Sequence, residues 1–339
     1  MPSLTTLKDR TAGTADFLPA AEAALAAFPI EPAGIEPVSL SENATFRVVD
    51  RRDGSVYVLR LHRPWYHSHE ELLSERVWMR ALSAAGISVP RGVRSHDGSD
   101  YVQVDVAHNS ERRWAGVTHW IEGELLLKVM RESADLAVIA AHFQRLGAMT
   151  ARLHNQSSVW LVPPGFRRQS LDVEGLMGEQ PFWGRFWEHR RLSADESALL
   201  LRARDRMRDV LQRLGQDRAI YGLIHADLHP ANLLVQGDRL TVIDFDDCGF
   251  GWHLYDIAVA FVHHQDAADF PVLQQSFIDG YRTRRALSDS MVALLPAFRL
   301  IRGMAQIGWF HQRPELDDRP FFRHSKDRIL ARCEALLSS

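Results

Sequence analysis

Cysteine, lysine and glycine-rich loops are the scarce features of this 339-residue sequence. Its two cysteines, Cys248 and Cys333, do not form a CxxC pair, so neither a disulfide framework nor a thiolate metal site is indicated. The motif GxxxxGK[ST] is absent, and Gly249-Phe250-Gly251 lacks the third glycine of a dinucleotide fingerprint. A P-loop site is therefore excluded, and a Rossmann-type site is not indicated.

Lysine occurs only at Lys8, Lys128 and Lys326, so a mechanism that needs lysine has few places to find one. The formal net charge of -3 gives no general attraction to nucleic acid or to anionic membranes. No terminal apolar segment is long enough to span a bilayer, and the alanine-rich run 15–28 carries acidic residues, as in an amphipathic helix. We therefore expect a cytoplasmic protein with no nucleic-acid or membrane partner.

The periodicity of apolar residues changes along the chain. Residues 38–63 form two alternating runs separated by Asp53-Gly54, which predicts a hairpin with a two-residue type I′ turn. The polar loop "LSENAT" precedes the second strand of an expected three-stranded flap. A helix is predicted from His69 to Gly86, and "YVQVDVA" and "AGVTHWIEG" predict further strands. After about residue 130 the pattern is mostly helical, over 134–155, 193–215, 252–264, 270–283 and 288–311. The fold class is therefore α+β, with a β-rich lobe at 1–122 and a mainly helical lobe at 123–339.

The stretch "LIHADLHPANLLVQGDRLTVIDFDD" is the part of the helical lobe that is not helix. Its "NLLV", "QGD" and "RLTVID" segments predict a hairpin with Asn232 at one foot and Asp244 at the other. Two oxygen donors that converge in this way suit a hard cation such as Mg²⁺, with Mn²⁺ as the alternative. Asp227 lies five residues before Asn232, where its carboxylate can accept the proton of an attacking hydroxyl.

The spacing H-x-D-L-x-x-x-N, met here by residues 225–232, is also the pattern of phosphoryl-transfer enzymes. Together with "IDFDDCGFGWHLYDIA" it resembles the aminoglycoside phosphotransferase and choline/homoserine kinase family, whose members share the bilobal protein-kinase-like fold. The resemblance covers about residues 38–309. It implies that Asp227 is catalytic, that Asn232 and Asp244 bind Mg²⁺, and that His225 and Asp256 support the catalytic loop. ATP is then the co-substrate and a small hydroxyl compound the partner.

The resemblance also implies a nucleotide site in the β-rich lobe. Kinases of this fold have a basic residue on the third strand that binds the phosphates and pairs with a helical glutamate. That place holds Arg60, with Glu75 as its expected partner and Glu71 as the competitor. Ser41 and Asn43 of the polar loop are expected near the phosphates, and Trp120, Ile121 and Glu122 at the lobe connection are expected to bind adenine through their main chain.

The acceptor is less clearly marked. Candidates by location are Asp246, Trp252, His253, Tyr255, Arg299, Arg302, Gln306 and Trp309. Arg299 and Arg302 are three residues apart on one helix, and we expect Arg302 in particular to face the cleft. Arginines and aromatics in this region favour a homoserine-like amino acid or an amino alcohol over a polycationic aminoglycoside. An aminoglycoside-type antibiotic and a protein serine, as in bacterial stress kinases of this fold, remain alternatives.

Two other function classes are open. His225, Asp227 and His229 alternate as in a hydrolase metal site, because an extended segment turns every second side chain to one face. Such a site would need a further ligand. The chain could also be an inactive nucleotide-binding module, although Asp227, Asn232 and Asp244 are all present. Oligomeric state and the choice between ATP and GTP leave no trace in the sequence.

Overall fold

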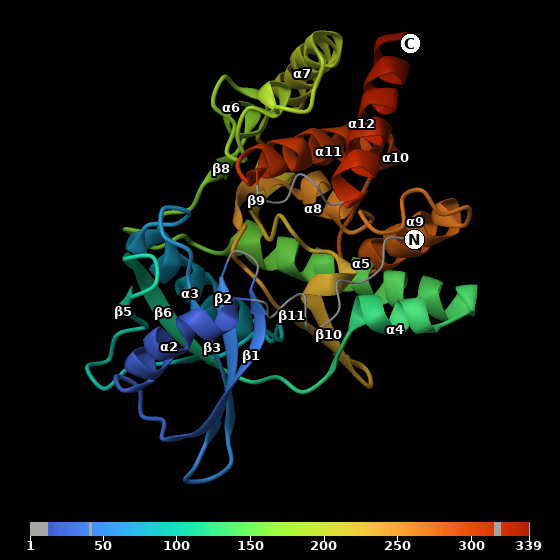
Figure 1. Cartoon of the computed structure of the whole chain (residues 1–339). Coiled ribbons are helices and arrows are strands. Elements are labelled where there is room, and N and C mark those ends of the chain that lie inside the picture. Colours follow the sequence, from blue (N-terminus) through green and yellow to red (C-terminus); the bar gives the residue numbers. More distant parts are fainter. Residues whose placement is uncertain (1–12, 41–42, 315–319, 339) are drawn as a thin grey trace.

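The N-terminal part of the chain is an antiparallel sheet, seen at the lower left of Figure 1. The computed structural model describes residues 13–40, 43–314 and 320–338. Strand order is β1-β2-β3-β6-β4, with β5 also paired to β6. The strands are β1 (Pro32–Leu40), β2 (Ala44–Asp50), β3 (Val56–Leu61), β4 (Gly92–Val93), β5 (Tyr101–Val106) and β6 (Glu111–His119). This arrangement confirms the predicted β-rich beginning.

Two helices accompany the sheet and face different cores. Helix α2 (Leu18–Leu25), preceded by the 3-10 turn η1 (Thr14–Phe17), buries its alanines with the apolar side chains of β2 and β3. Helix α3 (His69–Ala84) begins at a capping box made by Ser68 and Glu71. Its buried Trp78 belongs to the large core of the helical part and donates from Nε1 to Gln156 Oε1 at 3.1 Å. Helix α3 therefore ties the sheet to the rest of the molecule.

The remainder of the chain is mainly helical (Figure 1). Its helices are α4 (Leu126–Glu132), α5 (Leu136–Val159), α6 (Val173–Met177), η2 (Phe186–Glu188), α7 (Ala194–Leu214), η3 (Pro230–Asn232), α8 (His253–Val259), α9 (Phe270–Arg282), α10 (Asp289–Val292), α11 (Leu295–His311) and α12 (Pro320–Ser338). Two small sheets are set among them, β11-β10-β7 and β8-β12-β9. Their strands are β7 (Glu124–Leu125), β8 (Ser170–Leu171), β9 (Tyr221–Ile224), β10 (Leu233–Gln236), β11 (Arg239–Val242) and β12 (Gly249–Trp252).

The segment between β6 and β7 connects the two parts, and the predicted boundary at 122/123 falls within it. Gly123 has φ 146°, and a Cβ at this position would lie 2.9 Å from the carbonyl oxygen of Val235 on β10. Glycine is needed here because the backbone passes so close to its neighbour. The connection is therefore packed directly on the β10–β11 hairpin.

Several predicted boundaries were wrong. The β2–β3 hairpin exists, but a five-residue loop, 51–55, joins its strands, and of the turn residues only Gly54 has positive φ (75°). A type I′ turn needs positive φ at both central residues, so the Asp53-Gly54 prediction fails. The helix predicted at 252–264 ends at Val259, and that predicted at 288–311 is two helices, α10 and α11, with Pro296 at the start of the second.

Residues 289–311, which include α11, are long and apolar enough by length and composition alone to cross a membrane. Helix α11 packs against α8, α12 and η2, and its apolar side chains belong to the large core. A core helix of a soluble protein has this composition. Figure 1 shows α11 enclosed among the C-terminal helices.

Candidate active site

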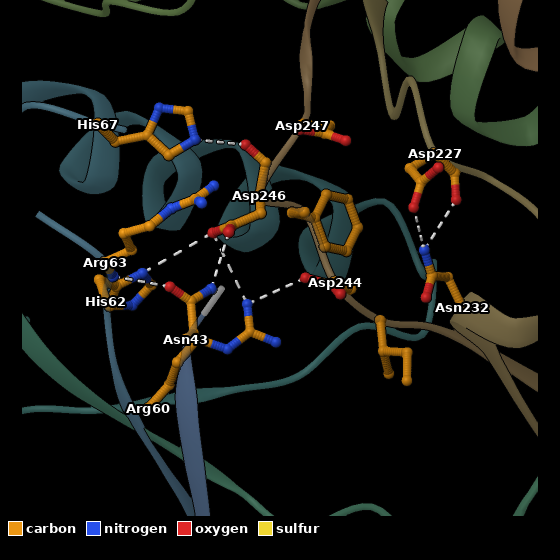
Figure 2. A network of polar contacts seen from close by, with 12 residues as sticks. Asn43, Arg60, His62, Arg63, His67, Asp227, Asn232, Asp244, Asp246 and Asp247 are labelled. Carbon is orange, nitrogen blue, oxygen red and sulfur yellow. Dashed lines mark hydrogen bonds and ion pairs between the residues drawn. The ribbon is translucent and has the colours of Figure 1, made fainter. Parts of the chain in front are cut away.

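The β10–β11 hairpin brings Asp227, Asn232 and Asp244 together, as the spacing predicted. Leu233 pairs with Val242 at the open end of the hairpin, and the Ile243 amide donates to the Asn232 carbonyl at 3.0 Å. Asn232 Nδ2 donates to both the Asp227 carboxylate (2.8 Å) and the Asp227 carbonyl (2.9 Å). Figure 2 shows that this leaves the Asn232 amide oxygen on the side away from Asp227.

Two residues of the site have a left-handed backbone that is costly for non-glycine residues: Ala226 and Asp244, each with φ 64°. The turn at Ala226 is held by Asp256 of α8, which accepts from the amides of His225 (3.0 Å) and Ala226 (2.7 Å). His154 Nε2 lies 3.2 Å from the same carboxylate. Asp256 is thus the loop-supporting residue that the motif implied, although burial raises its pKa to about 6.

His225 supports the loop from its inner side. Its Nε2 lies 3.0 Å from the Ile243 carbonyl oxygen, and its Nδ1 accepts from the Asp227 amide at 3.3 Å. Burial lowers the pKa of His225, which fits a neutral ring that donates from Nε2 and accepts at Nδ1. Both nitrogens are therefore engaged. In the alternative hydrolase site of His225, Asp227 and His229, the His225 ring therefore has no nitrogen left to bind a metal ion.

Asp227 is an ionised carboxylate that contacts Arg302 and His229. Arg302 Nη2 lies 2.7 Å from Oδ1, and His229 Nε2 lies 3.3 Å from Oδ2. Burial raises the pKa of Asp227, but His229 and Arg302 outweigh this and hold it well below its usual range. A carboxylate of this kind can orient a hydroxyl, and the ion pair with Arg302 makes it a weaker proton acceptor.

Arg60 joins the sheet to the segment that follows β11 (Figure 2). Its Nη1 donates to Asp244 Oδ1 at 3.0 Å and lies 3.7 Å from Asp246 Oδ1. Burial lowers the pKa of Arg60, but Asp244, Asp246 and Glu75 raise it by more. Asn43 Nδ2 donates to Asp246 Oδ2 at 2.8 Å, and Asn43 Oδ1 accepts from the Arg63 amide. This Arg60 network places one guanidinium beside the proposed metal ligand.

The donor set at the hairpin feet fits a hard divalent cation. The Asn232 amide oxygen and the Asp244 carboxylate, whose side chain is 41% exposed, are both oxygen donors. Within the described residues there is no group of three or more His, Cys, Asp or Glu side chains that could hold a metal ion. Two protein oxygens suit Mg²⁺, which keeps water and phosphate oxygens as its other ligands.

Glu75 does not form the expected ion pair with Arg60, which pairs with Asp244 and Asp246 instead. Glu75 is buried, and burial, followed by the neighbouring Asp246, raises its pKa. Its competitor Glu71 closes the α3 capping box by accepting from the Ser68 amide. The ion pair expected between Arg60 and Glu75 is therefore replaced by ion pairs of Arg60 with Asp244 and Asp246.

At the lobe connection, the Trp120 amide donates to the Val56 carbonyl at 2.9 Å, so this group is not available to an adenine ring. Ile121 is half-buried and Glu122 is exposed. Ser41 lies outside the described residues. Asn43 is placed in the Arg60 network, beside the expected phosphate position.

Three of the predicted acceptor residues have other roles. Asp246 belongs to the Arg60 network between the two parts of the molecule. Trp252 is fully buried and donates from its indole to the Gly215 carbonyl at 2.6 Å. Arg299 lies over the Phe270 ring, 4.6 Å from its centroid, and burial beside Arg332 lowers its pKa. Because α11 turns Arg299 and Arg302 to different neighbours, only Arg302 lies at Asp227.

Tyr255 stays close to the site. It is buried, its ring stacks on Trp183 with centroids 6.0 Å apart, and the Arg302 guanidinium lies 5.7 Å from the same Trp183 ring. Burial raises the pKa of Tyr255, so its hydroxyl stays protonated. Trp183, which no motif marks, therefore forms an aromatic wall beside Arg302.

The sequence analysis did not identify two residues that the structure places near the site. Arg168, in a segment without a motif, is buried and donates to the carbonyls of Cys248 (2.6 Å), Phe245 (3.4 Å), Asp246 and, on α3, Glu71 (3.3 Å). It fixes the segment after Asp244 to α3. Asp247 accepts from the Tyr66 hydroxyl, and burial and the nearby Asp227 raise its pKa. The "FDD" stretch drew attention to Asp247 but did not show its position.

The chain was compared with known proteins. The model of the phosphotransferase enzyme family matches residues 34–289. An amicoumacin kinase of Bacillus subtilis is 26% identical over 281 residues, which are 78% of this chain and 77% of that protein. A homoserine kinase of Rhizobium johnstonii is 28% identical over 232 residues, which are 67% of this chain and 64% of that protein.

Solved structures agree with this match. A microcompartment-associated aminopropanol kinase superposes with a TM-score of 0.78 at 35% identity, over 94% of both chains. The amicoumacin kinase hAmiN, in complex with AMP-PNP, Ca²⁺ and Ami, gives a TM-score of 0.73 at 25% identity, over 91% of this chain and 92% of that one. Both matches extend over nearly the whole chain.

Proposed function

Because the chain belongs to the phosphotransferase enzyme family of small-molecule kinases, we propose that it transfers the γ-phosphoryl group of Mg²⁺-bound ATP to the hydroxyl of a small amino alcohol. The observation that carries the proposal is the placement of Asp227 beside Asn232 and Asp244 at the feet of one hairpin. The reaction belongs in the cytoplasm, where ATP is supplied.

In this reaction the acceptor oxygen forms a bond to the γ-phosphorus while the bond to the β,γ-bridging oxygen breaks, and ADP leaves. Asp227 orients the hydroxyl and takes its proton as the new bond forms. Asn232 and Asp244 would hold the metal ion, which would neutralise phosphate charge. Arg60 is positioned to bind phosphate oxygens through the guanidinium nitrogens that do not contact Asp244.

The surroundings of Asp247 favour an acceptor that carries an ammonium group. The Asp247 carboxylate accepts from the Tyr66 hydroxyl, and burial and Asp227 raise its pKa by more than Tyr66 and Arg302 lower it. A half-buried carboxylate beside ionised Asp227 is stabilised by a cation. The Tyr66 ring, which packs on Phe182 with centroids 5.8 Å apart, adds an aromatic surface of the kind that attracts ammonium groups.

The surroundings of Arg302 support one of the two favoured acceptors over the other. Its charge is already compensated by Asp227 at 2.7 Å, so the site does not need a substrate carboxylate. This favours an amino alcohol over a homoserine-like amino acid. The second candidate rests on the homoserine kinases among the relatives, and it requires Arg302 to leave Asp227 for the substrate carboxylate.

The test is ADP release with a panel of acceptors: aminopropanol, ethanolamine, homoserine, a sugar and an aminoglycoside. We expect the highest kcat/KM with an amino alcohol.

Asp247→Asn should raise the KM of that acceptor by about ten- to a hundredfold, the effect of losing one charge-assisted contact, and leave the KM for ATP unchanged. Because the pKa of Asp247 is raised, the acceptor KM should increase as the pH falls, starting at a higher pH than an ordinary aspartate would cause.

Asp209→Asn, at an exposed position on α7, is the matched control and should change neither KM. A preference for homoserine that disappears in Arg302→Gln would replace the amino alcohol by the second candidate. An unchanged acceptor KM in Asp247→Asn would remove the ammonium contact from the proposal.

A further inference from the structure

A cavity of about 510 Å³ lies behind the β10–β11 hairpin, and its lining does not include Asp227, Asn232 or Asp244. Its walls are the end of α3 with the segment 86–89, one face of α5, residues 238–240 of the hairpin, and Arg284, which lies two residues beyond the end of α9. Four arginines line it, with a single carboxylate, that of Asp238: Arg145, Arg152, Arg239 and Arg284. This arginine cavity is basic in a protein of net charge -3.

None of the four guanidiniums is neutralised within the described residues. Arg145 donates to the Gly237 carbonyl (3.0 Å), Arg152 to the Gly86 carbonyl (2.7 Å) and Arg239 to Ser88 Oγ (2.9 Å). These acceptors are neutral, and the described residues offer the Arg284 side chain no hydrogen bond or ion pair. Some arginines outside the cavity, by contrast, pair with a carboxylate, as Arg80 does with Asp100 and Arg282 with Asp289. The guanidinium groups of the cavity therefore have no carboxylate partner within the described residues.

We propose that the arginine cavity is a second ligand site, which binds a small molecule with two or more carboxylate or phosphate groups. Each guanidinium carries five N–H donors in a planar fork, and the contacts above use only one or two of them. Arg145 and Arg152 are seven residues apart and share one face of α5. The volume is that of a small-molecule pocket, and its concave shape suits a compact polyanion.

The cavity borders β11, the strand that leads to the proposed metal ligand Asp244. The Ser88 carbonyl accepts from the Val242 amide at 3.0 Å, and Ser88 Oγ lies 2.8 Å from Thr241 Oγ1 and also accepts from Arg239. A ligand that spans Arg145, Arg152 and Arg239 connects α3, α5 and the hairpin. Binding should therefore stabilise the folded state, because a ligand that binds only the native form raises its free energy of unfolding.

The experiment measures thermal unfolding and titration calorimetry of the full chain with citrate and with pyrophosphate. Ionic strength and free Mg²⁺ are held constant, and AMP-PNP is present at saturation so that the nucleotide site is filled. We expect saturable binding of at least one probe with a rise in Tm. The two probes separate a carboxylate ligand from a phosphate ligand.

Variants locate the binding. Arg284→Gln removes an exposed side chain that makes no described contact, so it should fold normally and weaken binding about ten- to a hundredfold. Arg145→Gln combined with Arg239→Gln should weaken it further, whereas Arg94→Gln, exposed and outside the cavity, should leave it unchanged. Absence of saturable binding to both probes, competition with AMP-PNP, or an equal effect of Arg94→Gln would each overturn the proposal.

Discussion

At the scale of single residues, the site consists of charges that hold one another in place. Arg60 contacts Asp244 at 3.0 Å, and Arg302 contacts Asp227 at 2.7 Å. The sequence predicted Asp227, Asn232 and Asp244 because their spacing is local and the hairpin fixes their separation. It could not predict which acid pairs with Arg60, because the candidates come from α3 and from a segment nearly two hundred residues away. Arg168 and Asp247 depend on the same long-range packing.

Arg60 provides the first test at this scale. Arg60→Ala removes the guanidinium beside Asp244 and Asp246, so the KM for ATP should rise by about ten- to a hundredfold, while the KM for the acceptor stays nearly constant. Arg60→Lys should restore part of the loss, because it keeps the charge but not the planar fork. Steady-state kinetics with each substrate varied in turn measures both constants.

Arg112→Ala is the control, since Arg112 lies on β6 and pairs with the exposed Asp105. A similar change in both KM values for Arg60→Ala would assign this arginine to the scaffold rather than to the phosphate site.

At the scale of elements, the catalytic loop is supported by α8. The loop adopts a left-handed backbone at Ala226 because Asp256 binds two consecutive amides there. The sequence predicted the β10–β11 hairpin well, since its apolar alternation is continuous and its turn is short. The prediction failed at the β2–β3 turn, where the loop is longer than Asp53-Gly54 implied. There the Asp50 carboxylate accepts from the Arg52 amide, and the Asp50 amide donates to the Ser55 carbonyl.

Asp256→Ala tests the loop support. The change leaves the buried amides of His225 and Ala226 without an acceptor, and we expect the free energy of unfolding to fall by about 2–5 kcal/mol. Turnover should fall as well, because Asp227 follows Ala226 directly. Denaturant unfolding and kcat measure the two effects. Asp279→Ala, on the exposed face of α9, should change the free energy of unfolding by no more than about 0.5 kcal/mol. Equal stability of the two variants would contradict the role given to Asp256.

At the scale of the whole molecule, the β-rich part and the helical part meet at the site. Asn43 and Arg60 reach across from the sheet to Asp246 and Asp244, while Trp78 and Arg168 tie α3 to the helical part. The fold could be predicted because a short motif identifies the family. The orientation of α11 could not be predicted, because the helical period alone places Arg299 and Arg302 on one side of the helix, whereas the structure gives them different neighbours.

The most direct measurement of the account is phosphoryl transfer by wild type and Asp227→Asn, with product formation followed by ³¹P NMR and AMP-PNP binding by calorimetry. With Mg²⁺, ATP and the preferred amino alcohol, the wild type should form one phosphomonoester for each ADP. Asp227→Asn should keep nucleotide affinity nearly intact while kcat falls by roughly a hundredfold or more, the scale of lost general-base help. Wild-type turnover in Asp227→Asn would contradict the account, because the attacking hydroxyl would then be oriented by another group.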